Sequence, residues 1–249
     1  MFDFHERTVG LATQMPSTHG PRGVCARFVE RAERMAVGIG VKLSFEQDFD
    51  ALSTVHHESR KTGAILSSNF DTAAGYDGHQ GWWICGRDAA GEVVTTIAAR
   101  IYDWPDTSMA EEVESLRFLY QDVERWRLPQ ERCTVSAAAA RKITGRVFYG
   151  GGAWVRPDFR SKGLSSYLPR LSKVYGLARY NFDWATCVVE PMLARKGVFK
   201  RYGFDNIEFG IHFGGTRFGD HDTALCWLSR DEFIDDLAAV ERSPEILGI

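Results

Sequence analysis

The stretch from Arg146 to Ser165 reads RVFYGGGAWVRPDFRSKGLS, and no other stretch of the sequence says as much about the fold. Residues 146–155 are apolar enough for a central strand, and the consecutive glycines at 150–152 indicate a bulge or the close approach of a ligand. Pro157 ends this strand, because proline cannot donate to a strand ladder. Gly163 then precedes a helix. The stretch therefore predicts a strand, a turn and a helix in succession.

The helix after the turn has an apolar stripe. The first turn of any helix presents unpaired N–H groups and a partial positive charge, and Gly163 leaves room for an approaching anion. The turn therefore predicts a pyrophosphate site, to which Arg160 and Lys162 would add charge-assisted contacts unless they point into solvent. The alternative is that Gly163 merely allows tight packing. Residues at helical spacing form the stripe: Leu164, Tyr167, Leu168, Leu171, Val174, Tyr175 and Ala178.

The other elements follow from hydrophobic periodicity and turn residues. The β-rich runs 81–85 and 93–102 should pair as an antiparallel hairpin. Residues 58–80 should be loop with short helical pieces, and apolar spacing within 104–145 predicts one acidic helix from Val113 to Val123. Further helices are expected over 24–36, 49–55, 191–203 and 233–237, and further strands over 41–45, 183–190 and 225–228.

The composition excludes several classes of protein. Hydrophobic residues make up 44% and charged residues 25% of the 249 residues, which suits a globular protein with a sizeable core. A net charge of −3 argues against a general nucleic-acid or anionic-membrane binder, since both need a concentrated positive surface. No leader or membrane-span pattern is present, so we expect a cytoplasmic protein. Five widely spaced cysteines without a C-x-x-C pair predict free, buried thiols.

Two motifs resemble the signatures of the GNAT (Gcn5-related N-acetyltransferase) superfamily. Arg160-Ser161-Lys162-Gly163-Leu164-Ser165 resembles its R/Q-x-x-G-x-G/A signature, with Ser165 where the family usually has Gly or Ala. Further along, Phe199-Lys200-Arg201-Tyr202-Gly203-Phe204 is similar to the family's Tyr-x-x-x-Gly-Phe ending of the next helix. The two motifs have the family's order and spacing, and the resemblance extends over 41–228.

The resemblance implies an α/β (α+β) fold, in which helices flank a mixed, mostly antiparallel central sheet with splayed central strands. It makes 41–240 an acyltransferase domain with a helical insertion at about 104–145. Residues 1–40 would be a lead-in with an additional helix, and 241–249 a C-terminal tail.

The resemblance also implies a donor and its site. The co-substrate would be acetyl-CoA, without a metal, and the partner would be an amine that attacks the thioester directly. The thioester would lie between the splayed ends of the strands at 147–155 and 183–190, and a homodimer is an open alternative to a monomer. Trp154 and Val155 would lie alongside the pantetheine arm. The full set of residues placed at the donor is Trp154, Val155, Arg160, Ser161, Lys162, Gly163, Leu164, Ser165 and Phe199.

The groups that would move protons are less clear from the resemblance. Phe199 stands where the family usually has the tyrosine that protonates the leaving thiolate, and phenylalanine has no proton to donate. Tyr202 is a candidate substitute, although an aromatic residue before Gly203 also suits packing. Glu190 is the candidate base, because it ends the strand beside the splay. A carboxylate there would equally favour the dipole of the helix that begins at Pro191.

Several alternatives stay open at this point. His56 and His57 are adjacent and project differently from a helix, which disfavours a paired metal site, so surface histidines are the default. The acidic residues Asp103, Asp106, Glu111, Glu112 and Glu114 either attract a cationic amine or form a solvated helix face.

The leading function is acetyl transfer to the primary amine of a small molecule or peptide. One alternative, which Phe199 motivates, is an acyl-CoA-binding sensor or interaction protein with little or no turnover. Another is a phosphate-binding fold for a different nucleotide, although G-x-x-x-x-G-K-[ST] and a G-x-G-x-x-G after a strand are both missing.

Overall fold

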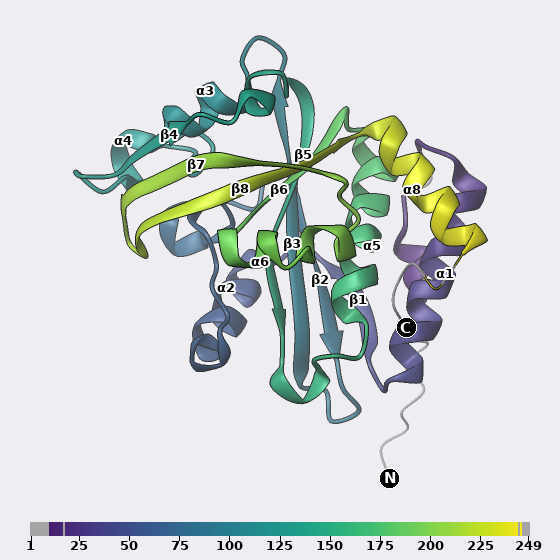
Figure 1. Ribbon diagram of the computed structural model, residues 1–249. Coiled ribbons are helices and arrows are strands. Elements are labelled where there is room, and N and C mark those ends of the chain that lie inside the picture. Colours follow the sequence, from purple (N-terminus) through teal and green to yellow (C-terminus); the bar gives the residue numbers. More distant parts are fainter. Residues whose placement is uncertain (1–9, 17, 244, 246–249) are drawn as a thin grey trace.

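The computed structural model describes residues 10–16, 18–243 and 245. Within these residues, one eight-stranded sheet has the order β1-β2-β3-β5-β6-β8-β7-β4, and helices lie against both of its faces (Figure 1). The strands are β1 (Lys42–Glu46), β2 (Gly81–Arg87), β3 (Val93–Trp104), β4 (Arg132–Val135), β5 (Gly145–Val155), β6 (Trp184–Val189), β7 (Asn206–Thr216) and β8 (Gly219–Ser229). The helices are α1 (Arg22–Gly38), α2 (Phe49–Glu58), α3 (Met109–Glu114), α4 (Val123–Trp126), α5 (Leu164–Tyr180), α6 (Pro191–Arg195), α7 (Val198–Arg201) and α8 (Arg230–Arg242).

The sheet diverges at its centre. Among the described strands every neighbouring pair is antiparallel except β5 and β6, which run parallel. Their pairing covers Val147–Tyr149 against Trp184–Thr186 and then stops, although both strands continue. The predicted mixed, mostly antiparallel sheet with splayed central strands is confirmed, as is the hairpin of β2 and β3.

Each face of the sheet carries its own hydrophobic cluster in the described part of the chain. Strand alternation puts Phe148 into the cluster that includes α1, α5 and α8, and Tyr149 into the cluster that includes α2 and α3. Figure 1 shows α1, α5 and α8 together on one side of the molecule. The five cysteines are buried and free, as predicted.

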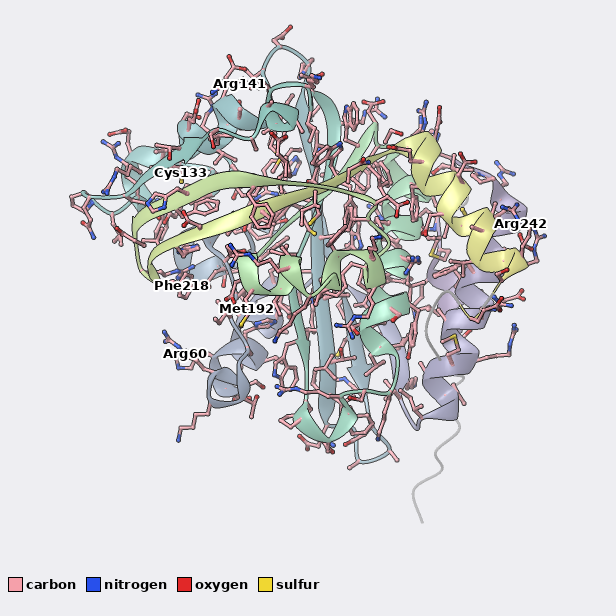
Figure 2. All side chains as sticks on the ribbon, viewed as in Figure 1. Arg60, Cys133, Arg141, Met192, Phe218 and Arg242 are labelled. Carbon is pink, nitrogen blue, oxygen red and sulfur yellow. The ribbon has the colours of Figure 1, made fainter. Side chains whose placement is uncertain are left out.

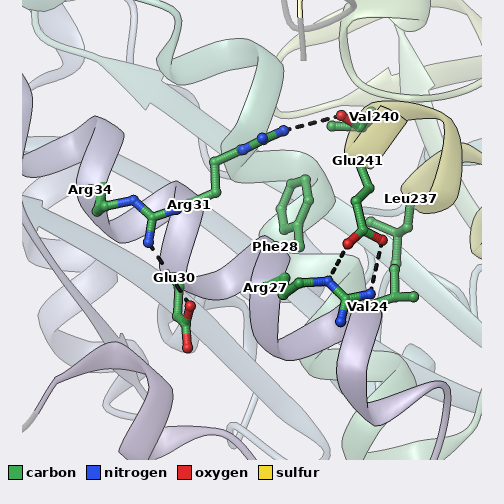
Figure 3. Close-up of a pocket in the computed structure, with 9 residues that line it drawn as sticks. All are labelled: Val24, Arg27, Phe28, Glu30, Arg31, Arg34, Leu237, Val240 and Glu241. Atoms are coloured by element: carbon green, nitrogen blue, oxygen red, sulfur yellow. Dashed lines mark hydrogen bonds and ion pairs between the residues drawn. The ribbon is translucent and has the colours of Figure 1, made fainter. Parts of the chain in front are cut away.

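Charged groups join α1 to α8 at the rim of a pocket of about 200 Å³ (Figure 3). Arg27 forms an ion pair with Glu241, and Nη1 of Arg31 donates to the carbonyl of Val240 at 3.1 Å. That carbonyl belongs to the last turn of α8, where carbonyls lack helix donors and the dipole favours a cation. α1 therefore stabilises the C-terminal end of α8.

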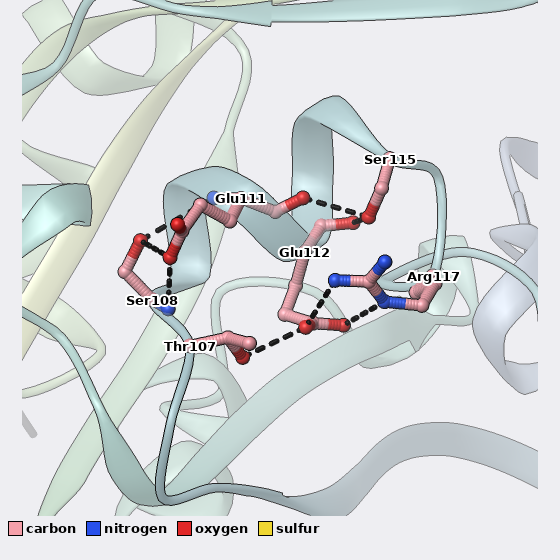
Figure 4. Close-up of polar contacts among 6 residues, drawn as sticks. All are labelled: Thr107, Ser108, Glu111, Glu112, Ser115 and Arg117. Carbon is pink, nitrogen blue, oxygen red and sulfur yellow. Dashed lines mark hydrogen bonds and ion pairs between the residues drawn. The ribbon is translucent and has the colours of Figure 1, made fainter.

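The prediction of a single acidic helix within 104–145 is wrong. α3 stops early, because Leu116 takes a left-handed φ of 65° and the chain reverses before α4 and β4. The buried Glu112 carboxylate stabilises this reversal, since it accepts hydrogen bonds from Arg117 Nε at 3.1 Å, Arg117 Nη2 at 2.8 Å and Thr107 Oγ1 at 2.8 Å (Figure 4). The apolar residues are buried although most of the segment is irregular, so their helical spacing wrongly predicts one continuous helix.

Two further boundaries differ from the expectation. The helix expected over 191–203 is interrupted at Gly197, whose φ of 69° separates α6 from α7. The closing strand expected over 225–228 begins earlier, at Gly219, and pairs with β7, which the periodicity did not predict. β7 and β8 form the long curved hairpin in Figure 1.

Candidate functional site

A groove of about 530 Å³ runs along α5, and we call it the α5 groove. Its walls come from β3, β5, the turn before α5, the first turns of α5 and the α6–α7 segment. It brings together residues that are far apart in the sequence. The predicted site residues that line it are Trp154, Val155, Arg160, Ser161, Leu164, Ser165 and Tyr202, while Lys162, Gly163, Glu190 and Phe199 are not among its lining residues.

One end of the groove is the N-terminus of α5. Gly163 is the N-cap with a φ of 82°, and Ser161 in the preceding turn has a φ of 62°. No side chain of the described residues caps this end, and the first turn of α5 contains no acidic residue. Asp158, in the preceding turn, is held by Arg156, whose Nε lies 2.8 Å from Asp158 Oδ1. Free N–H groups and the helix dipole therefore make this end an anion-binding surface.

The two cations of the turn have different environments. Arg160 donates from Nη2 to the carbonyl of Thr62 at 2.7 Å and from Nε to the carbonyl of Val155 at 3.1 Å. Lys162 is exposed, with Nζ 4.2 Å from the centroid of the Phe159 ring. Arg160 thus ties the turn at 60–62 to β5 and closes this end of the groove, whereas Lys162 lies outside it.

The floor of the groove is an unpaired strand edge. Within the described chain, residues 150–155 of β5 have β3 on one side and no strand on the other. Backbone groups on such an edge can bond an extended ligand. Trp154 is held in place, since its Nε1 donates to Thr62 Oγ1 at 3.1 Å and its carbonyl accepts from Thr95 Oγ1 at 2.8 Å. Gly151 admits no side chain, because a Cβ there would lie 2.7 Å from Phe70 Cε2.

Tyr202, which follows α7, also lines the groove. Burial raises the pKa of its phenol above the ordinary value, with a smaller contribution from the nearby Cys187 thiol. The phenol therefore keeps its proton throughout the neutral range. Phe199, one helical turn earlier, is 8% exposed and belongs to the hydrophobic core.

Two buried basic side chains of α5, Arg170 and Lys173, hold the segment that carries Tyr202. Neither was among the predicted site residues. Lys173 Nζ donates to the carbonyls of Tyr202 and Gly203 at 2.8 and 2.9 Å. Arg170 Nη1 donates to the carbonyl of Arg201 at 2.8 Å, while its Nε and Nη2 bind Asp236 of α8 at 2.8 and 3.0 Å. Burial lowers the pKa of Lys173 to about 7. The sequence does contain a signal for these two residues. Both lie in a helix that is buried nearly all round, where basic side chains must find hydrogen-bond acceptors.

Glu190 lies apart from these residues. It is exposed and precedes α6 as its N-cap, and its side chain does not cap the helix. Its carboxylate is not part of the groove wall.

Both histidines were expected at the surface. His57 is exposed, but His56 is buried. The His56 side chain is 3% exposed, and its Nε2 lies 2.9 Å from Thr96 Oγ1. Thr96 in turn donates to the carbonyl of Gly152 at 3.1 Å, so this pair supports the bulge between β3 and β5. Burial lowers the pKa of His56 to about 4, which keeps the ring neutral at physiological pH.

The acidic residues near α3 differ at Glu112 from the solvated helix face that was the alternative to an amine site, because Glu112 is buried. Glu111 makes a capping box with Ser108, and Glu114 Oε1 lies 3.3 Å from Arg141 Nη2. Together with the Glu112–Arg117 pair, these contacts occupy the carboxylates (Figure 4). Among the described residues, no helix is long and apolar enough to cross a membrane, and no group of three or more His, Cys, Asp or Glu side chains is arranged to hold a metal ion.

Comparison with known proteins gives structural matches alone. No family model matches the sequence, and no curated protein matches it. NAA60 of Arabidopsis thaliana, solved in complex with acetyl-CoA, is 14% identical with a TM-score of 0.48, over 77% of this chain and 99% of that chain. FeeM, an N-acyl amino acid synthase from uncultured soil microbes, is 12% identical with a TM-score of 0.47, over 81% and 97%.

A third solved structure is a GNAT superfamily phosphinothricin acetyltransferase from Sinorhizobium meliloti, in complex with AcCoA. It is 14% identical with a TM-score of 0.42, over 76% of this chain and 88% of that chain. All three TM-scores lie below 0.5, and the functional proposal below rests on the residues of the α5 groove.

Proposed function

We propose that this chain is an acyl-coenzyme A-dependent N-acyltransferase of the GNAT superfamily, which transfers an acetyl or another short acyl group to a primary amine. The continuity of the α5 groove carries the proposal. An uncapped helix N-terminus forms one end, an unpaired strand edge forms the floor, and the protonated Tyr202 phenol lies on the wall. A long ligand with an anion at one end and a peptide-like arm matches this order.

The residues of the groove fit such a donor. The N–H groups at the start of α5 would bind the pyrophosphate, and the bare edge at 150–155 would bond the amides of the pantetheine arm. Acyl-coenzyme A, when bound, would supply the acyl thioester. The arm would end where β5 and β6 part, beyond Tyr149, so the thioester carbonyl would face the opening between the two strands.

The reaction needs a neutral amine and a proton for the leaving thiolate. The amine nitrogen attacks the carbonyl carbon, the C–N bond forms and the C–S bond breaks. In this proposal Tyr202 gives its proton to the departing sulfur, because burial keeps that proton on the phenol at neutral pH. The proton that the nitrogen loses as the amide forms returns to the Tyr202 phenolate through water, so the phenol is restored. Glu190, which is exposed, accepts the proton of the ammonium through water.

A second candidate is an acyl-CoA-binding sensor with little turnover. Phe199 favours it, because this residue occupies the family's usual tyrosine position, lies in the core and has no proton to donate. The two candidates share the donor site and differ in whether Tyr202 can replace the missing phenol.

Thiol release from acetyl-CoA in the presence of a panel of primary amines tests the proposal, together with calorimetric titration of acetyl-CoA. We expect binding and amine-dependent release of free thiol. Binding without release on any amine would support the sensor, and the absence of acetyl-CoA binding would contradict both candidates.

A further inference from the structure

A small pocket lies where β5 and β6 part, on the face of the sheet opposite to α5. Tyr149 of β5 and Val188 of β6 line it, together with residues of the insertion at 104–145 and of the β7–β8 hairpin. We call it the inner pocket. Its volume of about 80 Å³ has room for a group of a few heavy atoms. Tyr149 is also the last β5 residue that pairs with β6, so the pocket lies where the two strands begin to diverge.

Glu131 supplies a buried carboxylate to the inner pocket. The residue is 6% exposed, and its Oε2 accepts from the Tyr120 phenol at 2.8 Å and from the Leu128 N–H at 3.1 Å. Within the described chain, no donor bonds Oε1 and no Lys or Arg forms an ion pair with this carboxylate. Burial of a carboxylate is unfavourable unless a cation compensates it.

The series of hydrogen-bonded side chains that leads from Glu131 to the nearest arginine does not supply that cation. Arg217, at the turn between β7 and β8, connects to Glu131 through Ser68 and Tyr120, with Arg217 Nη2 3.2 Å from Ser68 Oγ and Ser68 Oγ 3.3 Å from Tyr120 Oη. Its guanidinium is paired with Asp71 at 2.8 Å. None of the residues that line the inner pocket, all of which are described, is Lys or Arg. Glu131 is therefore the charged group of the pocket that lacks a counterion.

The remaining walls suit a cation. Phe118, Tyr149, Phe213 and Phe218 present aromatic rings to the pocket, and His221 stacks on Phe213 with ring centroids 5.3 Å apart. Aromatic faces attract ammonium groups and repel anions. A buried carboxylate with aromatic walls is thus an environment for an ammonium group.

We propose that the inner pocket binds an ammonium group of the acyl acceptor, and that Glu131 is the residue that recognises it. The proposal rests on the proposed N-acyltransferase function and gives the acceptor a chemical class, a cationic amine. A larger pocket of about 800 Å³ shares Phe218 with the inner pocket and holds the rest of the acceptor. Ile65 and Phe218, both exposed, form an apolar part of its rim, and polar or charged side chains such as Glu58 and Arg60 line the rest.

The test is calorimetric titration of benzylamine into the protein saturated with free coenzyme A, which cannot react. Benzyl alcohol is the uncharged counterpart of this probe. We expect the wild type to bind the amine and not the alcohol, and Glu131→Gln to weaken amine binding roughly 10- to 100-fold. The Gln side chain keeps an oxygen that accepts from Tyr120 and Leu128, so folding should survive.

Two further variants separate recognition from structure. Phe218→Leu removes an exposed aromatic face and keeps the apolar contact, so it should weaken amine binding by about threefold. Glu124→Gln, an exposed carboxylate on the same insertion, should bind the amine as the wild type does.

The possible failures are distinguishable. Loss of acetyl-CoA binding by the wild type would contradict the proposed function itself. Normal acetyl-CoA binding with an amine affinity that Glu131→Gln leaves unchanged, or with equal binding of benzyl alcohol, would overturn the acceptor site alone.

Discussion

Tyr202 is the residue whose proposed role depends most on its surroundings. In sequence it is an aromatic residue before a glycine, which is equally consistent with packing. In the structure it lines the α5 groove, burial raises its pKa, and Lys173 bonds its carbonyl. The resemblance put the proton donor at the position of Phe199, and Tyr202 is the phenol that we propose in its place.

Tyr202→Phe should therefore slow the chemical step and leave donor binding intact. The ring and its packing are retained, and the proton for the leaving thiolate is lost. We expect kcat to fall about 100-fold at neutral pH with the KM for acetyl-CoA within about twofold. Steady-state thiol release measures both constants. An unchanged kcat would mean that water protonates the thiolate.

His56 should make the folded protein sensitive to acid. Its folded pKa of about 4 lies below the ordinary value of 6.5, so the unfolded chain binds more protons between these two values. Stability therefore rises with pH across this window and is lost as pH falls through it. The expected loss between pH 6.5 and 5 is about 2 kcal/mol.

Urea unfolding at these pH values measures the effect of His56. His56→Gln should flatten the dependence of the unfolding free energy on pH, because Gln does not titrate. His57→Gln, a change at the exposed neighbour, should leave the slope as in the wild type. An equal slope for wild type and His56→Gln would show that another group causes the acid sensitivity.

At the scale of elements, the turn into α5 combines the proposed anion site with a left-handed backbone conformation. Gly163 has a φ of 82°, which a side chain adopts at a cost of about 1 kcal/mol. A substitution there has two effects, a local strain and a change of charge at the helix N-terminus. A test of the anion site must separate them.

Gly163→Glu should reduce the affinity for acetyl-CoA at least about tenfold, because it crowds and repels the pyrophosphate. Gly163→Gln carries the same bulk and strain without the charge, so the difference between the two isolates repulsion. Gly91→Glu, at a φ of 84° in the turn between β2 and β3, imposes similar strain away from the groove. Calorimetry gives the affinity and urea unfolding the stability. An affinity equal to that of the wild type would exclude this turn as the pyrophosphate site.

The α6–α7 segment shows how one element depends on its neighbours. Its carbonyls at 201–203 are bonded by Arg170 and Lys173 of α5, and Arg170 is bonded in turn by Asp236 of α8. The wall that carries Tyr202 is therefore held through α5 by the C-terminal helix. α1 contacts the same helix through Arg27 and Glu241, so the N-terminal helix belongs to the same supporting layer (Figures 1 and 3).

At the scale of the whole molecule, the sheet separates two regions with different chemistry. Figure 2 shows the side chains on both sides, with Met192 of α6, Phe218 of the β7–β8 turn and Arg60 after α2 on the same side of the view. The α5 face holds the groove proposed for the donor. The opposite face holds Glu131 and the aromatic pocket proposed for the acceptor, and Tyr149 of that pocket lies where β5 and β6 diverge.

The sequence by itself determined the strand, turn and helix at 146–180, because their signals are local: an apolar run, Pro157, Gly163 and a stripe at helical spacing. It also predicted the mixed sheet through the resemblance that these residues carry. The uncapped N-terminus of α5 follows from the same local signals.

Only the tertiary structure decided which side chains share a site. The periodicity of 113–123 wrongly predicted a continuous helix, because Leu116 takes a left-handed φ and the buried Glu112 carboxylate binds Arg117 across the reversal. Nothing in the sequence around Glu131 marks it as a pocket residue, since its aromatic neighbours come from Phe118 and Tyr120 before it, from β5 and from the β7–β8 hairpin. Burial and the absence of a counterion are properties of packing between distant segments, and only the folded chain defines them.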